Sequence, residues 1–477
     1  MLFCSITFLV FFLPAVLIFY YILPSLTYRN CILFFASLLF YAWGEPKFVF
    51  LMLASIIFNY IMGIQIGKDP VYKKTVLFIA ILMNLGILFI FKYLGFSCKI
   101  IDVILDTLHI KPLTIINLIM PIGISFYTFQ EISYLVDVYR KPELAQKNFL
   151  NLGLYITFFP QLIAGPIVRY RDINEQLSIR RESVPQFAEG LERFIIGLSK
   201  KVLLANTFAL VCDSVYESYF YSYGTYLAWI AAIAYTLQIY YDFSGYSDMA
   251  IGLAKLFGFE LPENFNYPYA ASSITDFWRR WHISLTSFFR DYVYVPLGGN
   301  RKGKLRTILN RFIIFFITGL WHGAAFTFIL WGVAHGFLMV TERAFQKQEL
   351  NKKNNVFLKF FAHLYTLFFV VILWVLFRAG IEQTPKLLLK MLGMNSIPFI
   401  QDEYLLLMID TKFYIFTVIG ILFAFPWWRK IELFYTNIVL VKKIFLAVKY
   451  FILICLLVLC YANLAGNSYN PFIYFRF

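Results

Sequence analysis

The chain has 477 residues, of which 60% are hydrophobic, 20% aromatic and only 14% charged. That much apolar surface exceeds what one soluble core can bury, so an ordinary soluble domain is excluded. The net charge of +15 is spread over short loops. Charge distributed in this way indicates membrane orientation and does not favour binding to nucleic acid.

Apolar stretches that approach the length of a membrane span recur from one end of the chain to the other. They are continuously apolar and do not alternate as barrel strands would, so we expect an all-α polytopic membrane protein of about ten to twelve transmembrane or re-entrant helices. The expected spans are Ile6–Leu23, Val49–Ile66, Val76–Phe91, Ile115–Leu135, Tyr226–Tyr241, Leu364–Phe377, Phe413–Phe425 and Phe445–Tyr461. Further candidates are Ile32–Tyr41, Phe149–Leu162, Phe194–Val211 and both sides of His322.

The sequence has no long polar linker, no Gly/Ser-rich hinge and no evident internal repeat. We therefore expect a single membrane domain over residues 1–477. The first apolar run lacks a basic n-region and a small-residue cleavage site, and is interpreted as the first membrane helix and not as a signal peptide. The segment Asn148–Arg193 mixes apolar, basic and proline residues, which indicates interfacial or re-entrant pieces.

Clusters of Lys and Arg predict which loops face the cytoplasm. The stretch between Arg311 and Arg343 has basic residues at both ends, so it should enter the membrane and return, with His322 deep inside a hairpin. The last span begins beside a basic cluster, so the tail Asn463–Phe477 should emerge on the outer face.

The triplet Trp321-His322-Gly323 lies in the middle of this apolar stretch. An ionisable group at membrane depth is by default a functional-site hypothesis. A neutral imidazole in a dry pocket walled by Trp321 can act as a general base that takes a proton from a hydroxyl group. The alternative is a histidine that bonds to a neighbouring helix and only fixes its packing.

A second histidine, His282, lies upstream in a segment rich in tryptophan and arginine. Acyl transfer needs a hydrogen-bond donor for the developing oxyanion, and His282 or Arg280 could supply it or orient the substrate. The remaining histidines are expected to be structural: His109, His335 and His363.

Two polar segments leave alternatives open. The run Tyr240–Asp248 is either a helix end with capping serines or the polar lining of a substrate channel that includes Asp242 and Ser244. The glycine pair before Asn300 could cradle the phosphates of a nucleotide-like donor, although basic flanks also arise for topological reasons.

Several common site motifs are missing from the sequence. Without HExxH, or histidines three or four residues apart, we expect no metal site. Without a P-loop or a Rossmann glycine pattern, ATP-driven pumping and nicotinamide chemistry have no support. The six cysteines form no CxxC pair, and we interpret them as packing residues.

Several motifs together resemble the membrane-bound O-acyltransferase family, in particular the bacterial branch that acylates extracellular polysaccharides. They are Trp278-Arg279-Arg280-Trp281-His282, Arg290-Asp291-Tyr292, Pro296-Leu297-Gly298-Gly299-Asn300 and Trp321-His322-Gly323, with Gln161, Ala164-Gly165-Pro166 and Tyr241-Asp242-Phe243-Ser244-Gly245. The resemblance implies a ring of helices around a central funnel and tunnel, with His322 as the essential histidine and His282 as its polar partner. It also implies acetyl-CoA as the donor. The residues we expect to bind substrate are Trp321, Arg280, Asp242, Ser244 and Asn300.

The C-terminal sequence Phe472-Ile473-Tyr474-Phe475-Arg476-Phe477 resembles a Phe-x-Tyr-x-x-Phe ending of this branch. The resemblance implies that Tyr474 carries the acyl group to an extracytoplasmic SGNH-type transferase. A phenol, with a pKa of about 10, is a better leaving group than a sugar hydroxyl, so its ester remains an activated donor. The alternative is an aromatic anchor at the membrane interface.

These observations predict an O-acetyltransferase of the bacterial cytoplasmic (inner) membrane that uses acetyl-CoA to modify a cell-surface polysaccharide. Its partners would be the SGNH-type transferase, the polysaccharide and membrane lipids, with no bound cofactor, metal or nucleic acid. Residue usage that suggests an AT-rich genome favours peptidoglycan over alginate. An alternative is a transporter or flippase of a lipid-linked sugar, which should show an inverted repeat and polar groups at the midplane of several helices. A second is a scaffold in a wall-synthesis complex.

Overall fold

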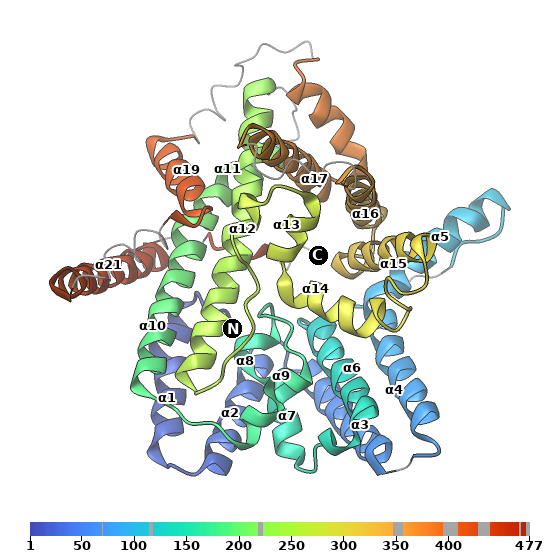
Figure 1. Ribbon diagram of the computed structural model, residues 1–477, viewed down its shortest axis with the longest axis vertical. Helices are drawn as coiled ribbons and strands as arrows, with labels where there is room; N and C mark the ends of the chain where they lie inside the picture. The colour runs from blue at the N-terminus through green and yellow to red at the C-terminus, as the bar shows by residue number, and fades with distance from the viewer. Residues whose placement is uncertain are drawn as a thin grey trace. The chain divides into compact units, whose positions relative to one another are not determined.

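The computed structural model describes residues 1–68, 70–113, 118–217, 223–346, 356–394, 409–427, 439–466 and 469–473. Throughout these residues the regular secondary structure is helical (Figure 1), which confirms the expected all-α class. Contacts divide the chain into two compact units. Unit 1 comprises 1–191, 250–262 and 323–325, and unit 2 comprises 192–249, 263–322 and 326–477. The single domain expected from the sequence stays a prediction.

Five helices in the described part of the chain are long and apolar enough to cross a membrane, which agrees with a polytopic membrane protein. They are Phe48–Lys68, Lys73–Thr107, Val184–Tyr216, Val356–Met391 and Lys443–Gly466. Three shorter apolar helices accompany them: Thr7–Ile22, Leu26–Ala42 and Thr411–Phe423.

The α-helices of the first half of the chain are α1 (Leu13–Ile22), α2 (Leu26–Ala42), α3 (Phe48–Lys68), α4 (Lys73–Leu88), α5 (Leu94–Thr107), α6 (Ile124–Arg140), α7 (Phe149–Thr157), α8 (Phe159–Leu162), α9 (Tyr170–Ser178), α10 (Val184–Ser199) and α11 (Asn206–Tyr216). Those that follow are α12 (Thr225–Leu256), α13 (Ile274–Arg280), α14 (Ile283–Phe289), α15 (Lys304–His322), α16 (Phe326–Gln346), α17 (Val356–Met391), α19 (Thr411–Phe423) and α21 (Val439–Gly466). Short π-helical segments connect several of them, among them η4 (Lys200–Ala205) and η6 (Arg290–Tyr294).

Two of the expected spans differ from the helices observed. The span expected from residue 115 becomes helical only at Ile124, because Gly123 has a φ of +76° and ends the preceding turn. The stretch 149–162 is broken at Phe158, which has non-helical backbone angles (φ −46°, ψ +107°) between α7 and α8. Pro160, near the start of α8, favours such a break because proline suits the first turn of a helix and not its interior.

Unit 1 holds polar side chains inside an apolar helix cluster. In the packing of α3, α4 and α6, Ser55 donates to Glu131 Oε1 at 2.7 Å. Nearby, the amide side chains of Asn59 and Asn84 bond to each other. A buried polar group costs free energy unless a hydrogen bond replaces the water that it loses. These pairs therefore favour the packing in which each polar side chain meets its partner, and so fix how the three helices face one another.

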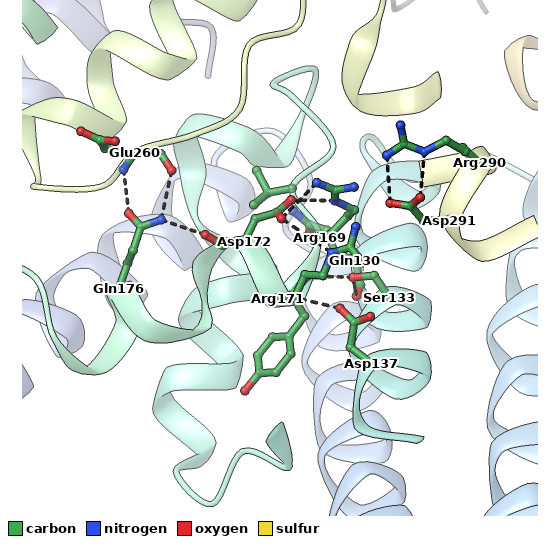
Figure 2. Close-up of polar contacts among 12 residues, drawn as sticks. Gln130, Ser133, Asp137, Arg169, Arg171, Asp172, Gln176, Glu260, Arg290 and Asp291 are labelled. Carbon is green, nitrogen blue, oxygen red and sulfur yellow. Dashed lines mark hydrogen bonds and ion pairs between the residues drawn. The ribbon is translucent and has the colours of Figure 1, made fainter. Parts of the chain in front are cut away.

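The start of α9 is fixed by side chains of α6, as Figure 2 shows. Ser133 Oγ accepts from the backbone N–H of Tyr170 at 3.1 Å, and Asp137 accepts from that of Arg171 at 3.2 Å. Arg169 forms an ion pair with Asp172 at 2.7 Å. The first N–H groups of a helix have no partner within it, so these acceptors determine where α9 begins.

In unit 2, α15 and α16 pack as a close antiparallel hairpin. Gly319 and Gly332 make this possible, because a Cβ at either position would overlap a backbone carbonyl oxygen of the facing helix. The first helix ends at His322 and the second begins at Phe326. The prediction that His322 lies within a hairpin is therefore confirmed, whereas its membrane sidedness stays a prediction.

The long helix α12 runs without interruption from Thr225 to Leu256. The sequence left open whether Tyr240–Asp248 marks a helix end. That interpretation is wrong, since Asp242 and Ser244 lie well inside α12 and both are buried.

The end of the last helix also differs from expectation. Helix α21 continues to Gly466, so the tail expected from Asn463 begins a turn later. Of the tail, Tyr469–Ile473 is described. Tyr474, the predicted acyl carrier, lies outside the described residues.

Candidate active site

His282 occupies the residue before α14 in an unusual backbone conformation. Its φ of +45° and ψ of +54° lie in the left-handed region. A side chain other than glycine held in such a region costs on the order of 1–3 kcal/mol, and such residues cluster at functional sites. The His282 side chain is fully buried, and its Nδ1 lies 3.0 Å from Asn264 Oδ1.

The contacts of Asn264 determine the tautomer of His282. Ser284 donates to Asn264 Oδ1 from its backbone N–H at 3.3 Å and from its hydroxyl at 2.8 Å. A backbone N–H can only donate, so the atom facing it must be the amide oxygen. His282 therefore carries its proton on Nδ1 and donates it to Asn264, which leaves the lone pair on Nε2. A neutral His282 in this tautomer can accept a hydrogen bond at Nε2 but cannot donate one there.

The environment of His282 also favours the neutral ring. Burial lowers the pKa of His282 well below its usual range, and the positive charge that His322 can carry adds to this effect. Around it, the Phe243 ring meets the imidazole edge to face at 4.6 Å between centroids. A dry aromatic wall of this kind disfavours the charged form.

His322 is the last residue of α15 and lies inside an aromatic cage. The centroid of its ring is 5.0 Å from that of Trp321, 5.1 Å from that of Trp331 and 5.4 Å from that of Phe377. Trp321 also contacts His282, with 5.8 Å between the two ring centroids. The two histidines named from the sequence are thus brought together around Trp321.

Trp331, in α16, adds a polar group to this cage. Its side chain is fully buried, and its indole N–H has no hydrogen-bond partner among the residues that the structure describes. A buried donor without a protein partner is costly unless something else accepts from it. Trp331, whose ring contacts that of His322, is therefore a candidate donor to a bound molecule.

The other residues expected to bind substrate lie in different settings. Arg280 forms an ion pair with Asp276 one helical turn earlier, at 3.0 Å, and Asn300 is exposed after a glycine turn. Asp242 forms a buried ion pair with Lys201 at 2.8 Å. Ser244 is buried, and its hydroxyl has no partner among the described residues. Substrate contacts by these four residues stay predictions.

The expectation that His335 is structural agrees with its contacts. His335 Nδ1 accepts from the indole N–H of Trp278 at 3.2 Å. The centroid of its ring also lies 4.8 Å from that of Trp331, so it packs against one member of the His322 cage. Outside the cage, His363 Nδ1 lies 2.9 Å from the Ala271 carbonyl oxygen.

Sequence reasoning missed Asn264 and the aromatic side chains Trp331 and Phe377. Asn264 precedes His282 by a loop and a short helix, and no periodic pattern connects the two. Trp331 and Phe377 are ordinary members of apolar helices by composition. The one available signal was the glycine pair Gly319 and Gly332, which predicts close packing of α15 on α16 and so places Trp331 near His322.

The helical architecture and the histidine pair define a polytopic membrane protein with a buried, aromatic, imidazole-based site. Residues 138–381 match the family model of the membrane-bound O-acyltransferases. The chain belongs to this family and is an acyltransferase.

Three curated relatives illustrate what the chain is similar to. The probable alginate O-acetylase of Pseudomonas aeruginosa is 43% identical over 382 residues, which cover 80% of this chain and 72% of the relative. The peptidoglycan O-acetyltransferase of Helicobacter pylori is 36% identical over 431 residues, covering 83% and 81%. The teichoic acid D-alanyltransferase of Bacillus subtilis is 33% identical over 258 residues, covering 50% and 62%.

Proposed function

We propose that this protein takes an acetyl group from acetyl-CoA on the cytoplasmic side and delivers it across the bacterial inner membrane for O-acetylation of a cell-surface polysaccharide. The observation that carries the proposal is the arrangement of His322 and His282 around Trp321, with His282 fixed in one neutral tautomer by Asn264. Two buried imidazoles, one of them held neutral, suit proton transfer during acyl exchange, a chemistry that a transporter of a lipid-linked sugar does not need.

In the proposed step, the His322 imidazole removes the proton from the acceptor hydroxyl while the oxygen attacks the thioester carbonyl. The new C–O bond forms, the C–S bond breaks, and the CoA thiolate leaves and takes up the proton from the imidazolium. The acceptor hydroxyl has a single proton, which goes to His322, so His282 Nε2 accepts instead from an amide N–H of the CoA arm and orients the donor. This role fits the tautomer of His282 better than donation to the oxyanion. Trp331 donates its indole N–H to the carbonyl oxygen as negative charge develops there.

The proposed first acceptor is the Tyr474 phenol, from which a partner SGNH-type transferase moves the acetyl group to the sugar. Two observations support this. The two residues directly ahead of Tyr474, Phe472 and Ile473, are buried in unit 2. A phenyl ester is also a more activated donor than an alkyl ester, because the phenol has a pKa of about 10. Changing Tyr474→Phe keeps the aromatic ring and removes only the oxygen. Polymer acetylation in cells should then fall to background, and undiminished acetylation would rule out the carrier role.

Peptidoglycan is the acceptor polysaccharide we favour. The match to the peptidoglycan O-acetyltransferase extends over 431 residues and covers more of both chains than the match to the probable alginate O-acetylase. The higher identity of the latter, 43% against 36%, makes alginate the second candidate. Mass spectrometry of wall fragments and of exopolysaccharide, from cells with and without the gene, distinguishes the two.

The activity itself can be tested with the purified chain in proteoliposomes. Acetyl-CoA labelled in the acetyl group should lose its label to the protein, with release of free CoA detected by a thiol reagent. A transporter or flippase of a lipid-linked sugar should release no CoA. Absence of both CoA release and protein labelling from a folded sample would contradict the proposed function.

A further inference from the structure

The short segment Tyr469–Ile473, which follows α21, is held inside unit 2 by polar contacts. The Tyr469 hydroxyl donates to Asp213 at 2.5 Å, and the side chain of Asn206 donates to that of Asn470 at 3.1 Å. The chain then turns inward, and Ile473 is only 3% exposed. An ordinary chain terminus is poorly ordered unless specific contacts tie it down.

The innermost contacts come from one buried ion pair. Lys201 on η4 and Asp242 on α12 lie 2.8 Å apart, and each side chain is 1% exposed. The Lys201 ammonium donates to the Pro471 carbonyl oxygen. On the other side, Asp242 Oδ2 accepts from the backbone N–H of Ile473 at 2.8 Å. The pair therefore binds one backbone acceptor and one backbone donor, two residues apart.

The side chain of Phe472, which lies between these two backbone contacts, packs against α12 and helps to fix the position of the segment. Phe472 is buried and stacks on Tyr246, with 4.7 Å between ring centroids and 29° between ring planes. Pro471 has no backbone N–H to offer. A slip of the segment by one residue would move Phe472 off Tyr246 and present the wrong backbone groups to the two charges.

A buried ion pair is a poor source of stability, because removing both charges from water costs about as much as their attraction returns. Such a pair is better explained when it specifies a geometry. We propose that Lys201 and Asp242 form a clamp that sets the register of the C-terminal segment, and so fixes the chain immediately ahead of Tyr474. They are positioning residues. The clamp does not depend on the proposed acyl-carrier role, but its consequence for catalysis rests on that role.

A neighbouring ion pair supplies a matched control. Lys200 and Asp248 connect the same two elements, η4 and α12, at 2.6 Å. Both side chains are more exposed than those of the clamp. No contact of theirs with the tail is found among the described residues. Changing Lys200→Met therefore breaks an ion pair between η4 and α12 without touching the clamp.

The test measures hydrogen exchange of the C-terminal peptide by mass spectrometry, with the full chain in lipid nanodiscs. The double variant Lys201→Met/Asp242→Leu replaces both charges with apolar side chains, a change that folded proteins often tolerate. Exchange at Ile473 should become at least about tenfold faster, because hydrogen bonds to charged groups contribute about 1.5–3 kcal/mol. Lys200→Met should leave the exchange rate unchanged.

A charge swap separates a clamp from ordinary helix pairing. Lys201→Asp/Asp242→Lys restores opposite charges between η4 and α12 but presents a carboxylate to the Pro471 carbonyl and an ammonium to the Ile473 N–H. The clamp predicts that tail exchange stays fast. Slow hydrogen exchange of the C-terminal peptide in the charge-swap variant would overturn the clamp. An exchange rate equal to that of the wild type in a folded Lys201→Met/Asp242→Leu variant would also overturn it.

The same samples distinguish this inference from the proposed function. Acetyl labelling of the protein should fall at least about tenfold in the double variant, in proportion to the loss of tail binding. If Tyr474→Phe retains full acetylation, the carrier role is wrong and the exchange results still decide the clamp. If exchange is unaffected in the double variant while Tyr474→Phe is inactive, the clamp is wrong and the carrier role stands.

Discussion

His282 donates its Nδ1 proton to Asn264 Oδ1 at 3.0 Å, and that bond fixes both the tautomer and the orientation of the ring. The same oxygen accepts two hydrogen bonds from Ser284. The His282 ring, which contacts Trp321 of the His322 cage, is therefore held in place by an uncharged amide. An amide holds the tautomer without adding the negative charge that would raise the pKa of His282.

Replacing Asn264 by alanine should remove the hydrogen bond that fixes the tautomer and orientation of His282. A buried group that loses its hydrogen-bond partner costs about 1–3 kcal/mol, which corresponds to a rate loss of about 5- to 150-fold if the cost falls on the transition state. The measurement is CoA release per folded protein. Asn84→Ala serves as the control, since it breaks a buried amide pair in unit 1 and should lower stability without changing that rate. Equal effects of the two variants would remove the special role of Asn264.

The indole N–H of Trp331 should contribute to the rate and not to the assembly of the cage. In Trp331→Phe the aromatic ring remains and the donor is lost. Loss of one oxyanion donor costs about 100- to 1000-fold in turnover, so CoA release should fall by about that factor while the KM for acetyl-CoA changes little. Trp278→Phe, in the same aromatic cluster, removes an indole N–H that is already bonded to His335 and should cost far less. A similar loss in both variants would indicate packing alone.

His282 should also shape the dependence of stability on pH. Because burial lowers its pKa in the folded state, the unfolded chain binds a proton near pH 6.5 that the folded chain rejects. The free energy of unfolding that comes from keeping His282 neutral is fully present above about pH 6.5. It is lost as the pH falls below that value, with a slope of up to about 1.36 kcal/mol per pH unit. His282→Gln lacks this group, so its stability should depend less on pH between 7 and 5. Thermal unfolding of both proteins across that range checks this, and parallel curves would contradict it.

The glycine contact between α15 and α16 should be intolerant of a methyl group. In Gly332→Ala the new Cβ would meet the Phe315 carbonyl oxygen, and forced overpacking typically costs about 1–3 kcal/mol. The Tm should fall, and the cage around His322 should loosen. In Gly86→Ala nothing lies within 4 Å of the new Cβ, so the Tm should hold or rise, because alanine favours the helix by up to about 1 kcal/mol. A tolerated Gly332→Ala would mean that the hairpin is not closely packed in solution.

The helical class and the two central histidines were predictable because both depend on local signals. Long apolar runs predict membrane helices whatever their neighbours, and a histidine inside such a run is conspicuous. The break at Phe158 was also within reach, since Pro160 follows it by two residues. Only its consequence, two short buried helices where one span was expected, needed the structure.

The partners of those histidines could not be predicted, because they depend on contacts between distant segments. Asn264 lies 18 residues before His282, and His282 itself adopts a left-handed backbone conformation that no sequence pattern predicts. Asp242 stood out as a carboxylate directly after an apolar run, which suggested either a helix end or the lining of a substrate channel. Its actual contacts are Lys201 and the C-terminal segment, and no spacing in the sequence connects these three.

The most direct test of the account concerns His322. Purified protein in proteoliposomes, supplied with acetyl-CoA, should release CoA and gain an acetyl label, whereas His322→Ala should lose both by at least about 100-fold, the lower range for removing a general base. The variant should keep the Tm of the parent to within a few degrees. A folded His322→Ala protein that still transfers acetyl at a rate close to that of the parent would contradict the account.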